Sequence, residues 1–293
     1  MNSVKEYAYA KVNLYLDVLS KRDDGFHDIK TVMHTVSLSD EITVSVKPSA
    51  RSEIKLTLAG NQRIPQDSRN LAYRAAELFI SATLINAEVN IRLVKNIPVA
   101  AGLAGGSADA AAVLRALNRV FKKPLTDKRL LSLAAELGSD VPFCLLGGTA
   151  LCFGRGERIE RLDDRLSLHM VIAVADEYVS TPQAYASLDE KYCDFTAERT
   201  DAPESYFTLL MDSLTRGSLG DSELYNIFEN AVFNTCFGAE TLKKKMLELG
   251  ARQALMSGSG PSVFGIFENP ALAERAKKAI EESGFRAFLA HSV

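Results

Sequence analysis

The sequence predicts an α+β protein built from two lobes. Alternation of apolar and polar residues with period two dominates the first 60 residues, which is typical of strands with one buried face. Segments with helical spacing follow, and strands and helices mix again toward the C-terminus. Gly154 and Gly156 interrupt the chain, and the pattern restarts near residue 158. We therefore expect one domain over residues 1–157 and a second over residues 158–293.

The composition is that of an ordinary globular protein. Of the 293 residues, 47% are hydrophobic and 24% charged, and the formal net charge is −3, so no basic field points to nucleic acid or an anionic membrane. None of the four cysteines lies in a C-x-x-C pair, which gives no indication of a zinc site. The N-terminus lacks an apolar signal core, and no apolar run approaches the ~20 residues of a membrane span. We expect a cytoplasmic protein with reduced thiols and neither a nucleic-acid nor a membrane partner.

Periodicity, caps and breakers define the expected elements. Thr126 can cap a helix that ends before Gly138, and Pro142 disfavours helix at the residue before it, so 138–142 should be a loop. The expected strands are 11–18, 29–37, 41–47, 53–59, 88–95, 168–175, 253–256, 262–267 and 285–291. The expected helices are 70–83, the segment between Ser107 and Pro124, 126–137, 181–188, 204–214, 224–236, 239–249 and 270–283. The polar segment 191–222 otherwise shows no clear pattern.

A loop of small residues joins the strand 88–95 to the helix after it. The loop reads Pro98-Val99-Ala100-Ala101-Gly102-Leu103-Ala104-Gly105-Gly106-Ser107-Ala108. Small side chains let backbone amides approach a ligand, and a helix N-terminus adds unpaired donors and partial positive charge. The loop could therefore cradle phosphate, or it could be a tight strand-to-helix crossover that needs glycine only for its turn. Local sequence leaves both interpretations open.

Spacing excludes two common phosphate motifs. No Gly-Lys-Ser/Thr follows the loop, as Walker A requires, and Gly102, Gly105 and Gly106 do not fit G-x-G-x-x-G. The loop closely resembles the second motif of the GHMP kinases, the superfamily of galactokinase, homoserine kinase, mevalonate kinase and phosphomevalonate kinase. Residues 8–16 (AYAKVNLYL) resemble the first motif of that family, and residues 255–262 (LMSGSGPS) resemble the third. The three motifs occur in the family's order and at its usual distances.

The resemblance implies a fold and a nucleotide. It implies an N-terminal lobe like ribosomal protein S5 domain 2, a ferredoxin-like C-terminal lobe, and ATP and acceptor meeting between them. ATP would be the phosphate donor, held by residues 98–108, with Mg²⁺ carried mainly by the nucleotide and no dedicated metal site in the protein. Ser107 would contact the β- and γ-phosphates, although a helix N-cap also explains it. Ala104 stands where many relatives have glycine, a change that costs little unless φ is positive there.

Other residues near the loop receive weaker assignments. Asn70, Leu71 and Lys95 would border the adenine by analogy. Asp109 is expected to be a first-turn acid favoured by the helix dipole, and it is not assigned to magnesium. The stretch Gly258–Gly260 would line the acceptor site or close over the phosphates, unless it is only a β-turn.

Lys11 and Asp140 match the catalytic positions of the family. Phosphoryl transfer needs alignment and charge stabilisation more than covalent chemistry. By the resemblance, Asp140 would be the general base that takes the proton of the acceptor hydroxyl, and Lys11 would be its electrostatic partner. On spacing alone, Asp140 would be interpreted as a turn residue after a helix, and Lys11 as a solvated strand residue.

Part of the sequence resembles family members with a particular acceptor. The stretches 10–14, 24–27 and 138–143 resemble members that phosphorylate the 2-hydroxyl of a small molecule carrying a cytidine diphosphate group, in the synthesis of isoprenoid precursors. The residues assigned to this substrate by resemblance are Asn13, Phe26, His27, Thr181 and Tyr185. A neutral imidazole at His27 suits a cytosine edge, and Phe26 and Tyr185 could stack on the base from opposite faces.

A purely structural role is an alternative explanation for each of these residues. Ordinary packing explains Phe26 and Tyr185, an exposed turn explains His27, and a strand-edge hydrogen bond explains Asn13. Another GHMP kinase, acting on homoserine or mevalonate, is the nearest rival enzyme, and the aromatic residues argue against it. A ligand-binding relative without turnover is a rival of another class, and retention of the catalytic pair argues against that. We expect a monomer or a homodimer.

Overall fold

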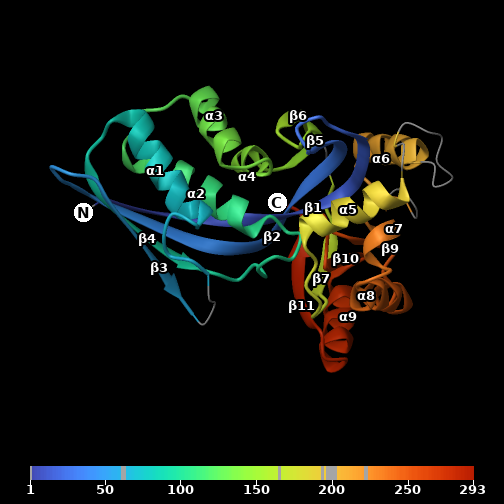
Figure 1. Ribbon diagram of the computed structural model, residues 1–293. Coiled ribbons are helices and arrows are strands. Elements are labelled where there is room, and N and C mark those ends of the chain that lie inside the picture. The colour runs from blue at the N-terminus through green and yellow to red at the C-terminus, as the bar shows by residue number, and fades with distance from the viewer. Residues whose placement is uncertain (1, 61–63, 164–165, 193–194, 196–202, 221–223) are drawn as a thin grey trace. The chain divides into compact units, whose positions relative to one another are not determined.

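The computed structural model describes residues 2–60, 64–163, 166–192, 195, 203–220 and 224–293 (Figure 1). Its described residues form two compact units, the first comprising Met1–Ala10, Ser39–Val99 and Ala104–Gly147, and the second Lys11–Leu38, Ala100–Leu103 and Gly148–Val293. The expected division after residue 157 stays a prediction, because the second unit also includes two segments from the first half of the chain. Residues 193–194, 196–202 and 221–222 of the polar segment 191–222 lie outside the described residues.

Two long strands contribute to both units. These are β1 (Asn2–Lys21) and β2 (His27–Pro48). Strand β1 extends beyond the expected strand 11–18 at both ends, and β2 continues through the break expected between residues 37 and 41. The further elements of the first unit are β3 (Glu53–Ala59), α1 (Leu71–Thr83), β4 (Ala87–Val94), α2 (Gly105–Val120), α3 (Asp127–Leu137) and α4 (Val141–Leu146).

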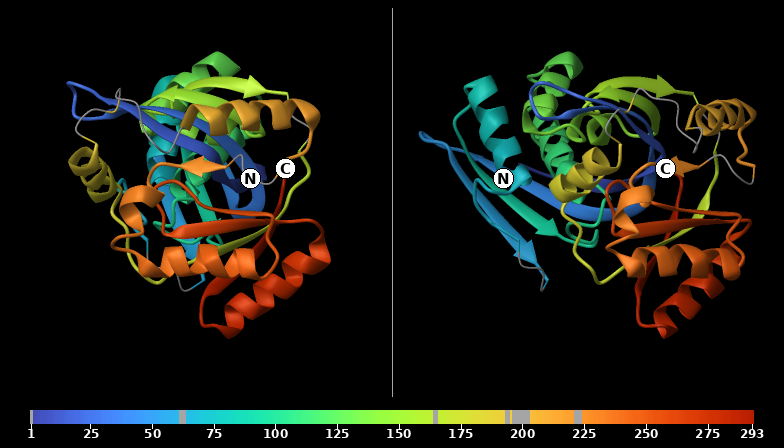
Figure 2. Two further views of the ribbon diagram at one scale, coloured as in Figure 1. Left: turned by 90° about the vertical axis from the view of Figure 1, so that its right-hand side faces the viewer. Right: turned by 45° about the vertical axis from the view of Figure 1, so that its right-hand side comes forward.

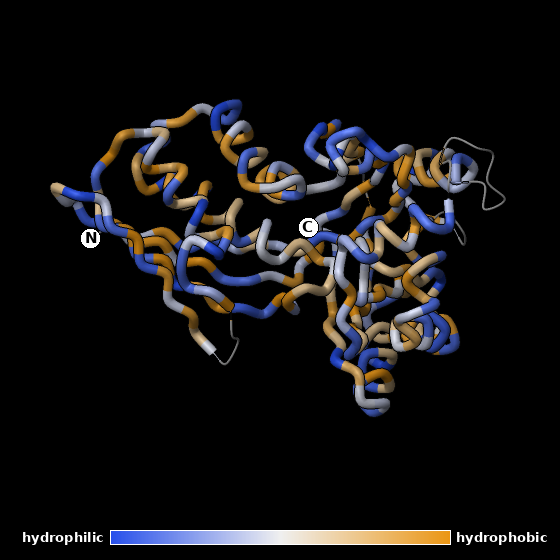
Figure 3. The backbone as a smooth tube through the Cα atoms, in the orientation of Figure 1, coloured by the Kyte–Doolittle hydropathy of each residue, from blue (hydrophilic) through white to orange (hydrophobic). Residues whose placement is uncertain are grey.

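The first unit packs its helices against one face of a mixed sheet (Figure 1). Strand β4 lies between β3, to which it is parallel, and the second half of β2, to which it is antiparallel. Helix α1 supplies the crossover that a parallel pair requires. Helix α2 contacts α1, α3 and α4, and its alanine-rich sequence buries Ala108 and Ala110–Ala112, so neighbouring helices can approach closely. Figure 3 shows the hydrophobic stretches along this sheet and along α2.

The second unit contains a four-stranded antiparallel sheet in the order β11-β7-β10-β9. Helices α8 and α9 pack on this sheet, as the rotated views of Figure 2 show. In chain order the strands read 4-1-3-2 across the sheet, which is the ferredoxin-like arrangement. The elements of this unit are β5 (Thr149–Gly154), β6 (Arg158–Leu162), β7 (His169–Val174), α5 (Thr181–Lys191), α6 (Pro203–Arg216), β8 (Tyr225–Asn226), α7 (Glu229–Val232), α8 (Phe237–Glu248), β9 (Gln253–Met256), β10 (Ser262–Phe267), α9 (Pro270–Glu282) and β11 (Arg286–His291).

Within the second unit, β1 and β2 also have partners that come late in the chain. Tyr15 and Leu16 of β1 pair in parallel with β8, and the first half of β2 pairs antiparallel with β5. Strands β5 and β6 form a hairpin, so the glycine-rich stretch near Gly154 is its turn. Within the described ranges, no helix has the length and apolar character needed to cross a bilayer.

Two expectations about secondary structure are wrong. The helix expected over 224–236 is instead the short strand β8, followed by the single-turn helix α7, because Asn226 bonds to residues far along the chain. The loop expected through Pro142 ends earlier, since α4 begins at Val141. Proline is tolerated there because it occupies the first turn, where its missing N–H would have no helical partner.

Candidate active site

Lys11 lies on β1 in the second unit, and its ammonium group is held by protein oxygens. Nζ donates to Asn13 Oδ1 at 2.7 Å and to the carbonyl of Gly102 at 3.1 Å, and the residue is only 4% exposed. The Lys11 amide also donates to Leu103 O. A strand residue and the glycine loop, about 90 positions apart by sequence, are thus joined at one buried cation.

The third motif closes on the same group of atoms. Asn13 Oδ1 accepts a second hydrogen bond, from the Gly258 amide at 3.0 Å, and Ser257 Oγ donates to Gly102 O at 3.0 Å. Gly102 has φ +75° and a Cβ there would lie 2.1 Å from Ser257 O, so only glycine fits. The three predicted motifs therefore meet at Lys11, Asn13, Gly102, Ser257 and Gly258, which we call the Lys11 cluster.

The glycine loop has a backbone of alternating handedness. Ala100, Gly102 and Ala104 have φ values of 54°, 75° and 55°, while the residues between them do not have positive φ. Alternation in the sign of φ is a feature of the backbone concavities called nests, in which successive N–H groups face an anion. The first alternative for this loop, a phosphate cradle, thus has a backbone that suits it.

Ser107 does not cap the helix that follows the loop. Helix α2 starts at Gly105, and Ala104 occupies the N-cap position without a side-chain hydrogen bond. The first helical bond runs from the Ala108 amide to Ala104 O, so the amides of Gly105, Gly106 and Ser107 precede the helical ladder. The N-cap explanation for Ser107 is wrong because the helix begins two residues before it.

A buried charge cluster lies beside the start of α2 in the first unit. Lys95 Nζ bonds to Asp40 and, at 2.8 Å, to Asp109 Oδ2, and all three side chains are at most 4% exposed. A Cβ on Gly105 would approach Lys95 Nζ to 2.9 Å. Asp109 lies in the second turn of α2 rather than the first, and its carboxyl pKa is raised well above its usual value by burial and by Asp40, against the effect of Lys95.

Asp40 is a residue that the sequence did not single out. Its Oδ1 accepts from the amides of Asn96 and Ile97 at 2.5 and 2.7 Å, so it fixes the turn that leads into the glycine loop. Asn70, expected near the adenine, is the N-cap of α1 and accepts from the Ala72 amide. The sequence gives no local signal for this role, because Asp40 and the amides it binds are 56 and 57 residues apart.

Asp140 lies in the first unit, at the N-cap of α4. Its backbone carbonyl accepts from the Cys144 amide at 3.0 Å, and its side chain is half-buried. Helix α4 packs on α2, and Arg115 of α2 donates to Cys144 O at 2.8 Å, which holds α4 in place. The fold thus presents Asp140 at a helix start anchored by two contacts.

His27 and Tyr185 come together in the second unit. Their rings stack with centroids 4.6 Å apart and an interplanar angle of 21°. His27 Nε2 lies 2.7 Å from Asp189 Oδ1, and Lys21 Nζ also donates to Asp189. Phe26 is 53% exposed, with the Arg155 guanidinium 4.8 Å from its ring centroid.

Two contacts connect α5 and β8 to the third motif. Thr181 Oγ1 lies 2.8 Å from Ser259 Oγ. Asn226 Nδ2 donates to Met256 O at 2.7 Å and to Gly258 O at 2.8 Å, and its Oδ1 accepts from the Phe228 amide. The sequence missed Asn226 because helical periodicity concealed its turn-forming chemistry.

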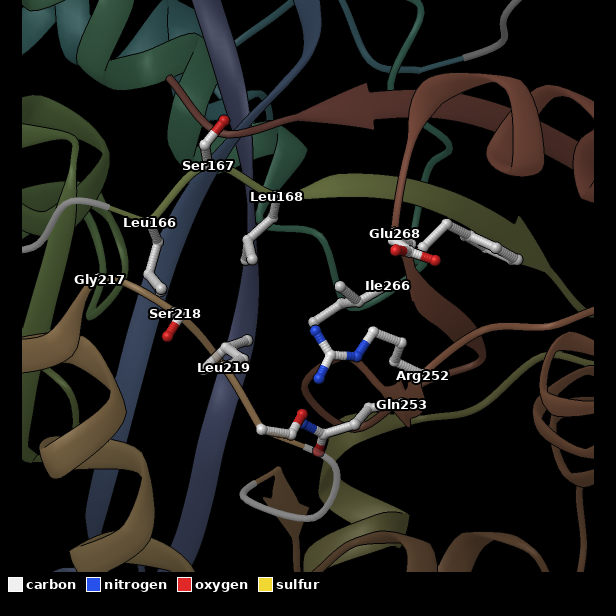
Figure 4. Close-up of a pocket in the computed structure, with 12 residues that line it drawn as sticks. Leu166, Ser167, Leu168, Gly217, Ser218, Leu219, Arg252, Gln253, Ile266 and Glu268 are labelled. Atoms are coloured by element: carbon white, nitrogen blue, oxygen red, sulfur yellow. The ribbon is translucent and has the colours of Figure 1, made fainter.

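A cavity of about 150 Å³ in the second unit is separate from these residues. It is lined by residues 166–168 and 217–220 and by the adjoining ends of β9 and β10. Figure 4 shows the Arg252 guanidinium directed toward its middle. No residue that the sequence singled out for catalysis or substrate lines this cavity.

Family models match both halves of the chain. The model for the GHMP kinases N terminal domain matches residues 70–148, and that for the GHMP kinases C terminal region matches residues 207–286. The chain belongs to the GHMP kinase family. The resemblance seen in the three motifs is confirmed, and so is the two-domain α+β fold. This kinase is accordingly a phosphotransferase of a family that uses ATP as phosphate donor.

Several relatives that share one name align with this kinase over nearly their whole length. A 4-diphosphocytidyl-2-C-methyl-D-erythritol kinase of Caldicellulosiruptor saccharolyticus is 41% identical, covering 94% of this chain and 93% of the relative. One of Clostridium acetobutylicum is 36% identical, covering 98% and 99%. A crystal structure of 4-(cytidine 5'-diphospho)-2C-methyl-D-erythritol kinase has a TM-score of 0.81 at 34% identity, covering 98% of each chain. A homoserine kinase of Cytophaga hutchinsonii, 21% identical with a TM-score of 0.77 over 100% and 95%, shares the fold.

Proposed function

We propose that this kinase transfers the γ-phosphate of ATP to the 2-hydroxyl of 4-diphosphocytidyl-2-C-methyl-D-erythritol, a step of the non-mevalonate route to isoprenoid precursors. Similarity over the whole chain to relatives of that name supports the choice of acceptor. The structural observation that carries the proposal is the Lys11 cluster, which joins the three motifs at one buried ammonium group.

In the proposed reaction, Asp140 is the general base. Its carboxylate accepts the proton of the acceptor 2-hydroxyl, the oxygen attacks the γ-phosphorus, and ADP leaves with the bonding electrons. Lys11 supplies the positive charge that balances the negative charge on the transferring group. Amides of residues 98–108, including those at the start of α2, bind the phosphates, since their N–H groups precede the helical ladder.

Mg²⁺ would arrive with the nucleotide. In the described part of the chain, no group of three or more His, Cys, Asp or Glu is placed to hold a metal ion, and the carboxyl groups of Asp40 and Asp109 both bond to Lys95. When bound to the β- and γ-phosphates, the ion neutralises part of their charge. We assign it no protein ligand.

The cytidine diphosphate end of the acceptor is assigned to Phe26, His27 and Tyr185. The exposed Phe26 ring offers a face for the base, and His27 offers a hydrogen-bonding edge. Asn13 and Thr181 contribute indirectly, because each bonds to the third motif. We propose a cytoplasmic location, the compartment in which cysteine thiols stay reduced.

The acceptor is tested by assaying ADP formation with purified kinase, ATP and one alcohol at a time. We expect turnover with the cytidyl acceptor and none with homoserine or mevalonate. His27→Ala should raise KM for the cytidyl acceptor far more than KM for ATP. Phosphorylation of homoserine or mevalonate with the cytidyl acceptor ignored would contradict the proposal.

The general base is tested by Asp140→Asn, which keeps the shape of the side chain but removes its basicity. We expect kcat to fall by about 10²- to 10⁴-fold, with KM for ATP nearly unchanged. Asp127→Asn, at the first turn of the neighbouring helix α3, is the matched control and should keep kcat. An unchanged kcat in Asp140→Asn would rule out the role of this carboxylate.

A further inference from the structure

Helix α5 presents two side chains to His27. Tyr185 and Asp189 are four residues apart, so they lie on the same face of the helix. Tyr185 stacks on the imidazole ring, and Asp189 Oδ1 lies 2.7 Å from Nε2. The His27 side chain is only 5% exposed, and Phe195 approaches the ring edge-on with centroids 6.0 Å apart. The imidazole is therefore fixed in both position and orientation.

The carboxylate of Asp189 determines which ring nitrogen carries the proton. Burial acts to raise the pKa of this carboxyl, but hydrogen bonds from Lys21 and His27 outweigh burial and hold the pKa below its usual value. An ionised carboxylate has only acceptors, so Nε2 must donate to it. In a neutral imidazole the other nitrogen, Nδ1, is then an acceptor.

We propose that Asp189 is the positioning residue that makes this kinase selective for a cytosine base over a uracil base. Cytosine presents an exocyclic amine, a donor, where uracil presents a carbonyl, an acceptor. An imidazole with Nδ1 as acceptor matches the amine and leaves the carbonyl of uracil unpaired. The inference rests on the proposed function, because it needs a cytidyl acceptor at His27.

A purely structural role is the competing explanation. The contacts of Asp189 with Lys21 and His27 could serve only to hold α5 against β1 and β2. That role predicts equal losses with any acceptor, since a displaced helix would harm both bases alike. The selective role predicts a loss confined to the cytidyl acceptor.

The first test compares kcat/KM for the cytidyl acceptor with kcat/KM for its uridyl analogue. In Asp189→Ala we expect the cytidyl-to-uridyl ratio to fall by about tenfold or more, with KM for ATP unchanged. Asp189→Glu, which restores an acceptor, should recover part of the ratio. Glu190→Gln removes an exposed carboxylate of the same helix and should keep the ratio. An unchanged ratio in Asp189→Ala, or equal losses with both acceptors, would overturn the inference.

The second test observes the tautomer directly in the full chain. Long-range ¹H–¹⁵N spectra of histidine-labelled kinase should show the proton of His27 on Nε2, with His27→Gln identifying its signals among the four histidines. A proton on Nδ1 would overturn the inference and leave the proposed function intact. A wild-type kinase that ignores the cytidyl acceptor would instead overturn the proposed function, and the inference with it. These spectra decide the matter even if Asp189→Ala does not fold.

Discussion

Ala104 has a backbone conformation that alanine rarely adopts. Its φ and ψ are 55° and 29°, in the left-handed region, and Ala100 has a similar φ of 54°. A side chain with a Cβ costs about 1–2 kcal/mol there. From the sequence, we expect alanine at 104 to cost little unless φ is positive. In the structure, φ is positive. Ala104 is therefore a strained position.

Replacing Ala104 with glycine should stabilise the kinase. We expect Ala104→Gly to raise the free energy of unfolding by about 0.5–1 kcal/mol, because strain is relieved and only part of the gain is lost to unfolded-state entropy. Ala108→Gly, in the buried interior of the same helix, makes the same chemical change and should lower it by about 1 kcal/mol. Urea denaturation measures both, and changes of the same sign would contradict the assignment of strain.

At the scale of single elements, the start of helix α3 could be foreseen from its capping residue, but the irregular segments could not. Thr126 accepts from the Arg129 amide as the N-cap of α3, as predicted, because capping is local chemistry. The segment 224–236 has helical periodicity and yet starts as a strand, because Asn226 bonds to the third motif about 30 residues away. At Asn226, three hydrogen bonds between one buried side chain and the backbone outweigh the local helical propensity.

Asn226 is accordingly the residue on which the shape of the third motif depends. Asn226→Ala leaves the carbonyls of Met256 and Gly258 and the Phe228 amide without their bonds. We expect the free energy of unfolding to fall by about 2–4 kcal/mol and KM for the acceptor to rise. Asn234→Ala, an exposed asparagine nearby, is the control and should change the free energy by less than about 0.5 kcal/mol. Similar losses in the two variants would refute this role.

At the scale of the whole molecule, stability depends on carboxyl groups of two opposite kinds. Hydrogen bonds from Arg69 lower the pKa of Asp67 to about 2, so its contribution is present above the unfolded pKa and is lost as pH falls. Burial raises the pKa of Asp109 and of Glu229, so their contributions are present at low pH and are lost as pH rises through the folded pKa.

The loss of the Asp109 contribution to stability at higher pH is tested by Asp109→Asn. The amide still accepts from Lys95 but does not ionise, so the stability of the variant relative to wild type should increase as pH rises from the usual pKa of an aspartate through the raised folded pKa of Asp109. Urea denaturation at several pH values measures the difference. Asp212→Asn, exposed on α6, should follow the wild-type curve. A constant difference between Asp109→Asn and wild type would show that Asp109 does not take up a proton on folding.

The sequence predicts the functional motifs of the chain better than the hydrogen bonds between residues that are distant in sequence. The three motifs, the family and the mixed fold follow from residue order, because glycine spacing and strand alternation are local signals. The bonds from Asn13 to Gly258 and from His27 to Asp189 join residues 245 and 162 positions apart. No spacing rule encodes such pairs, since the fold alone brings them together. The contacts within the Lys11 cluster, and the contact of Asp189 with His27, are therefore known only from the structure.

The alternating φ values of residues 100–104 have a last consequence. Every second residue there has a positive φ, so the binding of phosphate proposed for this loop would depend on main-chain conformation and not on side-chain charge. A cradle of amides has no ionisable group of its own. It keeps its polarity across the physiological pH range, so under the proposed function a chain of net charge −3 would bind the ATP phosphates through N–H groups whose polarity does not change with pH.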